Sequence, residues 1–217
     1  MTASKNKAFG IVMFVSLLAL LSSGCSSLFE AETLETEKNN GSAVITQTSV
    51  ELFKGDGAKF QPFLGPMSGA FKLSYEGNKP NAIMDIDIWQ NGKKVASAGS
   101  IGDLFFHSDA KMSREVEVII SIDTFFIEGQ DTFNTIKVST KNDSGSSTAT
   151  FTIPWDKKLT ARGLIYHSEP RTFTADEPVY LWGMQATSNN VISAADLSPE
   201  SLSGLERALI FTLRFED

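Results

Sequence analysis

Two histidines, each close to a carboxylate, are the residues of this chain best suited to hold a metal ion. His107 lies two residues before Asp109, and His167 lies two residues before Glu169. Imidazole and carboxylate groups are ligands of zinc and of other transition metals. Strings this short arise readily by chance at strand ends and in loops. We therefore expect all four side chains to be polar surface residues, and the sequence predicts neither a metal site nor a cofactor.

Two pairs of carboxylates have a spacing from which a glycosidase-like acid and base could be built. Asp85 and Asp87 form one pair, and Glu115 and Glu117 form the other. Such catalysis needs two carboxylates across a cleft, one of them kept protonated by apolar surroundings. Both pairs alternate with apolar residues, so they share the side of a strand that faces away from the apolar set. The pattern predicts a solvated sheet face, and a hydrolase of envelope polymers is the less favoured alternative.

Common signatures of nucleophilic and nucleotide chemistry are missing from the sequence. It contains no Gly-x-Ser-x-Gly string to mark a serine nucleophile, and Gly99 and Gly102 belong to an ordinary turn. It contains no glycine-rich loop leading into a helix, which phosphate binding would require. We therefore predict that the protein is not an enzyme.

Five aromatic residues are candidates for contact with a ligand or a partner. Phe105 and Phe106 are adjacent in the chain, as are Phe125 and Phe126, so one of each pair should point away from the buried side of its strand. Trp89 shares a strand side with the first carboxylate pair. Exposed aromatic groups mark binding surfaces, so these five are the predicted binding residues. The alternative is that a second layer or a long loop covers them.

The elements that must position these residues are strands, because apolar residues recur with period two after Ala43. The pattern is clear over 71–75, 84–88 and 116–122, and Asn91-Gly92 supplies the residues of positive φ that a tight hairpin requires. The same period returns in the stretches 95–98, 136–138, 149–153, 163–167, 179–185 and 208–215. Residues 142–145 provide the turn of a second hairpin. About ten strands are therefore expected.

These strands predict an all-β, mostly antiparallel sandwich, similar in shape to immunoglobulin-like domains. Pro154, Pro170 and Pro178 are expected between strands, where a missing N–H does no harm. Ser198 followed by Pro199 resembles a helix start, so one short helix is expected near 199–205. A closed barrel that carries a small apolar ligand, with phenylalanines lining its cavity, is the alternative architecture.

The start of the chain has the pattern of a secretory signal. Lys5 and Lys7 precede an apolar run over 8–21, and the run ends in Ser22-Ser23-Gly24-Cys25. A span of the bilayer would need roughly 20 apolar residues, so this run is too short to be a comfortable transmembrane helix. The sequence therefore predicts a signal helix that is removed from the mature protein.

The small residues followed at once by the single cysteine resemble the lipobox of bacterial prolipoproteins. In that family the chain is cut just before the cysteine, here between Gly24 and Cys25, and the thiol of Cys25 carries a diacylglyceryl group. The family usually has Leu three residues before the cysteine, where this chain has Ser22, with Leu21 one place earlier. The resemblance implies an extracytoplasmic protein held by Cys25 on the cell membrane or the outer membrane, since two acyl chains bind stably. An ordinary secretion signal that leaves Cys25 a free thiol is the alternative.

Charge and composition distinguish a tether from a folded domain in the rest of the chain. The leader holds two of the 19 basic residues and none of the 26 acidic ones, so residues 25–217 carry 17 against 26, a formal charge of −9. Such a surface repels nucleic acid, and no nucleic-acid partner is expected. Residues 25–42 are acidic and poor in apolar residues, which predicts a flexible tether. Residues 43–217 are long enough for one domain with a sizeable core.

These patterns together predict a membrane-anchored lipoprotein of the cell envelope. Its β-sandwich is expected to bind a protein partner or a ligand without catalysing a reaction. No sequence motif identifies that partner, and the fold by itself does not specify function.

Overall fold

The computed structural model describes residues 44–77, 81–105, 114–126, 132–174 and 176–216. The chain divides into two compact units, Met1–Asn40 and Gly41–Asp217, and every described residue belongs to the second unit. The predicted leader, Cys25 and the tether thus lie outside the described residues. Within the described ranges, no helix has both the length and the apolar character needed to cross a membrane.

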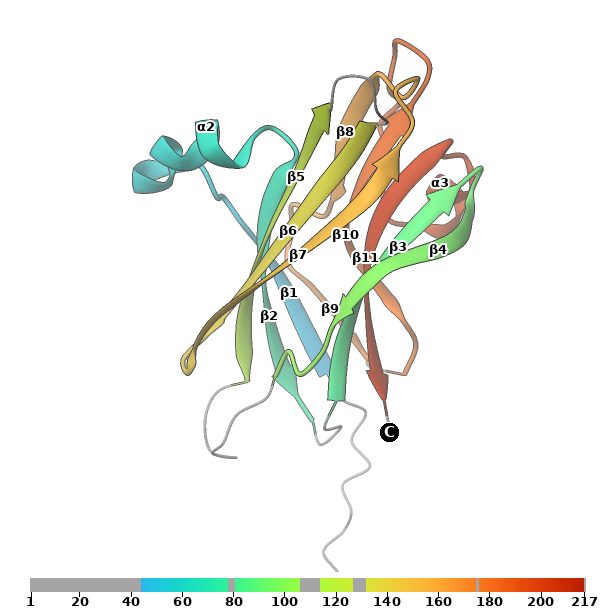
Figure 1. Ribbon diagram of the computed structural model, residues 1–217. Helices are drawn as coiled ribbons and strands as arrows, with labels where there is room; N and C mark the ends of the chain where they lie inside the picture. The colour runs from blue at the N-terminus through green and yellow to red at the C-terminus, as the bar shows by residue number, and fades with distance from the viewer. Residues whose placement is uncertain (1–43, 78–80, 106–113, 127–131, 175, 217) are drawn as a thin grey trace, which may run out of the picture. The chain divides into compact units, whose positions relative to one another are not determined.

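The described unit is an antiparallel sandwich of two sheets (Figure 1). In spatial order the six-stranded sheet consists of β7 (Gly145–Trp155), β6 (Thr132–Asn142), β5 (Glu115–Phe126), β2 (Ser68–Glu76), β1 (Val44–Val50) and β9 (Arg171–Thr174). The five-stranded sheet consists of β4 (Lys93–Ile101), β3 (Asn81–Gln90), β11 (Arg207–Glu216), β10 (Val179–Thr187) and β8 (Ala161–Tyr166). Each sheet keeps two edge strands, so the prediction of a sandwich is confirmed and the closed barrel is wrong.

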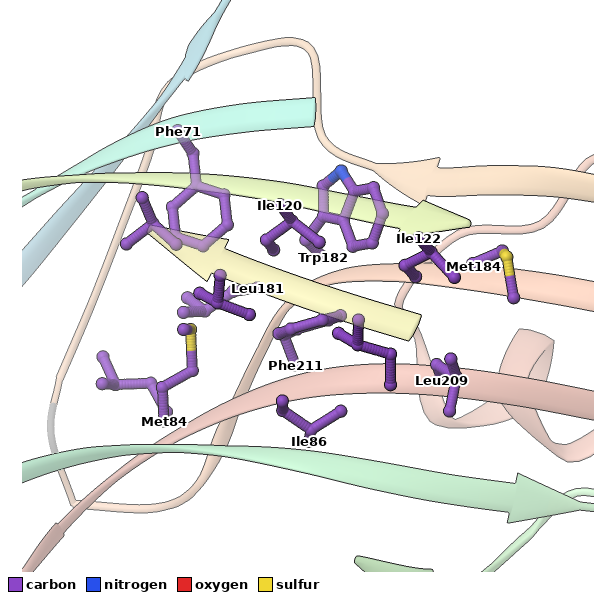
Figure 2. Packing of buried hydrophobic residues seen from close by; sticks show 14 of the residues in the cluster. Phe71, Met84, Ile86, Ile120, Ile122, Leu181, Trp182, Met184, Leu209 and Phe211 are labelled. Atoms are coloured by element: carbon purple, nitrogen blue, oxygen red, sulfur yellow. The ribbon is translucent and has the colours of Figure 1, made fainter. Parts of the chain in front are cut away.

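Side chains from the two sheets meet in one apolar core (Figure 2). Phe71 of β2 and Ile120 of β5 come from the six-stranded sheet, whereas Trp182 of β10 and Phe211 of β11 come from the five-stranded sheet. All four are buried, and the Trp182 ring meets the Phe211 ring edge to face at 5.4 Å between centroids. Burying one such side chain stabilises the fold by about 1.5–3 kcal/mol, which is why the period-two pattern fixes the faces of the strands.

The hairpin between β3 and β4 forms at the predicted turn. Asn91 and Gly92 have φ values of 49° and 74°, as the tight turn requires. Gly92 is also needed for space, because a Cβ atom there would lie 2.0 Å from the carbonyl oxygen of Ser203. That oxygen belongs to the end of α3 (Pro199–Ser203), the predicted short helix, whose first turn is capped by the Ser198 hydroxyl accepting from the Ser201 N–H.

Two features of the fold differ from the expectation. Pro154 lies inside β7 opposite Phe133 instead of between strands, and it is tolerated because β7 is an edge strand. A short helical segment follows β1, comprising η1 (Gly55–Phe60) and α2 (Gln61–Leu64), where no helix was expected. In Figure 1 this segment stands out from the side of the sandwich.

The carboxylates of β3 are buried, so the prediction of a solvated sheet face is wrong for them. Asp87 is 2 % exposed, and its Oδ1 lies 2.7 Å from Nζ of Lys94 while its Oδ2 accepts from the Thr212 hydroxyl at 2.8 Å. Asp85 accepts from the Ser100 hydroxyl at 2.6 Å and from Nε of Arg214 at 2.7 Å. Both carboxylates are thus engaged by cations and hydroxyls of β4 and β11 on the outer face of the sheet.

Candidate binding groove

A groove of about 920 Å³ opens where one edge of the six-stranded sheet meets one edge of the five-stranded sheet. Its walls come from the end of β1, the segment that follows β1, the start of β2 and the end of β8. We call this feature the edge groove and define it by Ser49, Val50, Gly69, Tyr166, His167 and Trp182. A concave site of this size is large enough for a drug-sized ligand or for a segment of polypeptide.

The wall formed by β1 has an open strand edge. β1 pairs with β2 along its whole length, from Val44 to Val50, whereas its pairing with β9 runs only from Val44 to Gln47. Along the last three residues of β1, therefore, one side of the strand has no described strand beside it. Free strand edges of this kind are templates for the addition of an extended peptide.

After β1 the chain forms an aromatic arm, which we define as η1 and α2 and of which Gln61 lines the groove. None of its residues is buried; Phe63 is 81 % exposed and Phe60 is 52 % exposed. The base of the arm is held to the sandwich, because the carbonyl oxygen of Leu64 accepts from the hydroxyls of Ser68 and Ser121, each at 2.9 Å. The arm therefore presents two large apolar side chains to solvent from a fixed base.

The floor of the edge groove is formed by Trp182 beneath Gly69. A Cβ atom at position 69 would lie 2.6 Å from Nε1 of Trp182, so the indole can reach this place only because residue 69 is glycine. The indole ring also packs in the core, where its edge meets Phe211. Trp182 thus connects the groove to the packing between the sheets, as Figure 2 shows for its core side.

A polar network ties the two sheets together at the groove. Arg171 of β9 donates from Nε to Oε1 of Gln47 at 2.8 Å, and it also donates to the carbonyl oxygen of Tyr180. Gln47 is buried and donates in turn to the carbonyl oxygen of Leu181 at 2.9 Å.

His167 lines the groove beside this network. Burial lowers the pKa of His167, and the positive charge of Arg171 lowers it further, while the charge of Asp196 raises it. The net lowering of the pKa favours the neutral imidazole of His167.

The groove brings serine hydroxyls and a histidine into one lining without joining them. Ser49, Ser68 and His167 all line it, but within the described residues no hydrogen bond connects His167 with either serine. The carboxylate in the lining, Glu51, is paired with Lys54 at 2.5 Å. The described residues of the groove thus offer surfaces for binding. They do not include a serine hydroxyl hydrogen-bonded to a histidine, the contact between nucleophile and base by which hydrolytic sites are recognised.

Two of the predicted aromatic residues have defined surroundings away from this groove. Phe105 is buried in the core and stacks on Tyr75 at 5.0 Å between ring centroids. Phe125 is 37 % exposed on β5 and stacks on Phe133 of β6 at 5.8 Å. The structure thus places Phe105 inside the molecule, as the alternative of a covering layer anticipated, and leaves Phe125 partly accessible.

Trp89 is covered by a second layer on the outer face of the five-stranded sheet. It packs with Tyr180, whose ring it meets edge to face at 5.7 Å, and with an apolar cluster that includes Leu197 and Leu202. Those leucines come from the segment between β10 and β11, which includes α3. Trp89, Phe105 and Phe125 are therefore not brought together into one surface.

Several of the other predicted positions fall outside the described residues. Phe106 and His107 lie outside the described residues, as do Asp109, Gly24 and Cys25, and so does the side chain of Phe126. Glu169 is exposed beyond the end of β8, and in the part of the chain that the structure covers no cluster of three or more metal-ligating side chains occurs.

The accessible aromatic residues of the arm, and Tyr166 in the groove, were missed by the sequence analysis. Phe60 and Phe63 lie in a stretch with neither strand nor long-helix periodicity, and Tyr166 ends a strand with its side chain 52 % exposed. The available signal was the pair of phenylalanines, Phe60 and Phe63, three residues apart between two glycines, Gly55 and Gly65. Both glycines have positive φ in the structure.

No family model, no curated protein and no solved structure matches the chain.

Proposed function

We propose that this protein is a membrane-anchored lipoprotein of the cell envelope whose sandwich binds an extended segment of a protein partner in the edge groove, without catalysis. The observation that carries the proposal is the free edge of β1 inside a groove of about 920 Å³. Gln61 of the aromatic arm lines this groove, and Phe60 and Phe63 of the same arm are exposed. The membrane anchor rests on the sequence of the leader, through Cys25.

The free strand edge favours a polypeptide over a small molecule. Main-chain N–H and C=O groups of β1 beyond Gln47 can pair with those of an added strand, which gives affinity that is independent of the side chains. The exposed rings of the arm and of Tyr166 then offer contacts for apolar side chains of that strand. Aromatic anchors of this kind commonly carry much of the binding energy at interfaces.

Site-specific photocrosslinking in cells tests the proposal. A photoreactive phenylalanine analogue placed at Phe63 or Tyr166 should form adducts with one protein, and the crosslinked peptide should be the same segment from both positions. Val95, which is 56 % exposed on β4, is the matched control and should give no such adduct.

Hydrogen exchange on the complex provides the second measurement. Binding by strand addition should slow amide exchange within 48–50, because the new strand protects that edge. Adducts of equal yield at Val95, adducts only with lipid or small molecules, or unchanged exchange at 48–50 would each contradict strand addition.

A further inference from the structure

The inner faces of the two sheets change from apolar to polar at one end of the sandwich. On β5 the buried Ile122 is followed, two residues later on the same face, by the polar Thr124. On the neighbouring β6 the polar Asn134 lies opposite Thr124, and the buried Ile136 lies opposite Ile122. In the other sheet Arg207 comes two residues before the buried Leu209 on β11, so it points inward too. In Figure 1 this is the end at which β5 and β7 finish and β8 and β11 begin.

Trp155, the last residue of β7, is the centre of this polar end. The indole is 4 % exposed, and two guanidinium groups lie near its ring: Arg162 of β8 at 5.3 Å and Arg207 at 5.9 Å from the centroid. Because both cations are near one ring, their guanidinium carbons are at most about 11 Å apart. Two positive charges thus lie near one buried indole.

Neither arginine is neutralised by an ion pair among the described residues. Arg162 donates to the hydroxyl of Thr124, and Arg207 donates to Oε1 of Gln90 at 3.2 Å, so the partners that hold them are neutral. Burial lowers the pKa of both guanidinium groups, and for Arg207 the charge of Asp156 partly opposes this effect. Asp156 thus acts on Arg207 from beyond ion-pair distance, and half-buried cations without a directly paired counter-ion are costly to keep in a folded protein.

Three buried N–H groups in the same place also lack an acceptor. They are Nδ2 of Asn134, Nε1 of Trp155 and Nε of Arg207, and the Asn134 side chain is fully buried. The three side chains belong to the same end of the core: Trp155 pairs with Thr132, Asn134 lies two residues further along β6 on the same face, and Arg207 is near the Trp155 ring. Oδ1 of Asn134 accepts from the Thr124 hydroxyl at 2.5 Å, which orients the amide. All the unused groups are donors, so the missing partner is an acceptor.

We propose that this polar end of the sandwich, defined by Thr124, Asn134, Trp155, Arg162 and Arg207, is a binding site for a small oxoanion, either a phosphoryl group or a carboxylate. An oxoanion offers several acceptor oxygens to the unused donors and one or two negative charges to the two guanidinium groups. The site is separate from the edge groove, and it does not depend on the proposed function.

Anion titration of the full-length protein in detergent tests the site. Thermal unfolding is measured in sodium phosphate, in sodium acetate and in sodium chloride at matched ionic strength, so that general screening is the same in each. Phosphate should raise Tm in a saturable way beyond chloride, because a ligand of the native state stabilises it. A rise with acetate as well assigns the site to oxoanions in general, and a rise with phosphate alone narrows it to phosphoryl groups.

Variants locate the effect. Arg162→Gln and Arg207→Gln should each weaken the apparent phosphate affinity by at least about tenfold, as loss of a charged donor predicts. Lys157→Gln removes a charge of the same sign from an exposed position between β7 and β8 and should leave the affinity unchanged.

NMR of the wild-type protein tests the site even if the arginine variants fail to fold. The NMR signal of the Arg207 Nε–H group should shift on addition of phosphate and remain in place with chloride. Equal Tm in phosphate, acetate and chloride together with an unmoved Arg207 signal would overturn the proposal, as would a loss of affinity in Lys157→Gln equal to that in the arginine variants.

Discussion

Nε of Arg214 on β11 donates to Oδ2 of Asp85 on β3 across 2.7 Å, on the outer face of the five-stranded sheet. Burial by itself would raise the pKa of Asp85, but the hydrogen bonds from Arg214 and Ser100 and the positive charges of Arg214 and Lys94 outweigh it and lower the pKa. The same contact raises the pKa of Arg214. A pair of this kind joins two neighbouring strands by charge as well as by backbone.

The lowered pKa of Asp85 makes a prediction about acid stability. A carboxylate whose pKa is lower in the folded state than in the unfolded chain contributes stability that is fully present above the ordinary value of 3.8 and is lost as the pH falls through the folded value. Asp85→Asn should therefore lower the free energy of unfolding at pH 7 by about 1–3 kcal/mol and flatten its fall below the ordinary value. Urea unfolding across this pH range measures both effects.

The matched control for this prediction is Glu216→Gln. Glu216 also pairs with Arg214, but its side chain is 49 % exposed, so its loss should cost less than about 1 kcal/mol. Equal costs for the two substitutions, or an unchanged pH dependence in Asp85→Asn, would contradict a structural role for the Asp85 pair.

Gly69→Ala should damage the edge groove through the tryptophan beneath it. The new methyl group would lie 2.6 Å from Nε1 of Trp182, and this indole is packed in the core and unable to swing aside. We expect a loss of about 1–3 kcal/mol in the free energy of unfolding, as for other overpacked sites, with a changed Trp182 fluorescence. Gly102→Ala, at a site where a Cβ atom meets nothing within 4 Å, is the control and should be nearly neutral. A neutral Gly69→Ala would show that the close approach is not required.

Phe63→Ser should separate binding from stability. The Phe63 ring is 81 % exposed and packs on no buried residue, so its loss should change the free energy of unfolding by no more than about 0.5 kcal/mol. Under the proposed function, the same substitution should abolish crosslinking from Tyr166 to the partner. Val95→Ser removes an exposed apolar side chain of β4 and should leave crosslinking intact. Full retention of the adduct in Phe63→Ser would exclude the aromatic arm from the interface.

The strands were predictable because the signal that defines them is local. Alternation over 84–88 or 116–122 says which side chains face the core, and Asn91-Gly92 says where the chain reverses. The pairing of these strands into two sheets follows from burying one face of each. By contrast, η1 and α2 are too short for any period to show, and none of their residues is buried.

What the sequence could not predict depends on partners distant in the chain. Asp85 alternates with apolar residues as a solvent-facing residue would, and the cation that pairs with it when it is buried, Arg214, is 129 residues away. Trp89 is covered because the segment before β11 folds over it. The edge groove likewise lies between β1 and β8, which belong to different sheets and whose relative placement no local pattern encodes. The candidate site was therefore missed: β2, β8 and β10 were expected, but no strand was assigned over 44–50, where β1 supplies the free edge of the groove.

The last prediction tests the proposed membrane anchor at Cys25. This residue is the single cysteine of the chain, so Cys25→Ala breaks no disulfide, and any effect on localisation reports on the thiol itself. If the leader acts as a lipobox, the wild-type protein should remain with membranes after a carbonate wash, because two acyl chains bind stably. The variant should be released or should accumulate unprocessed.

Ser27→Ala, two residues beyond the thiol, is the matched control and should stay on the membrane. Mass spectrometry of the mature N-terminus distinguishes the outcomes, since the wild type should begin at Cys25 and carry the mass of a diacylglyceryl group. Deletion of 26–42 should shift Tm by less than a degree or two, because a charged, apolar-poor segment has little to pack. A mature N-terminus elsewhere with an unmodified Cys25 thiol would replace the anchor with an ordinary secretion signal, and the partner of the edge groove would then be sought among secreted proteins.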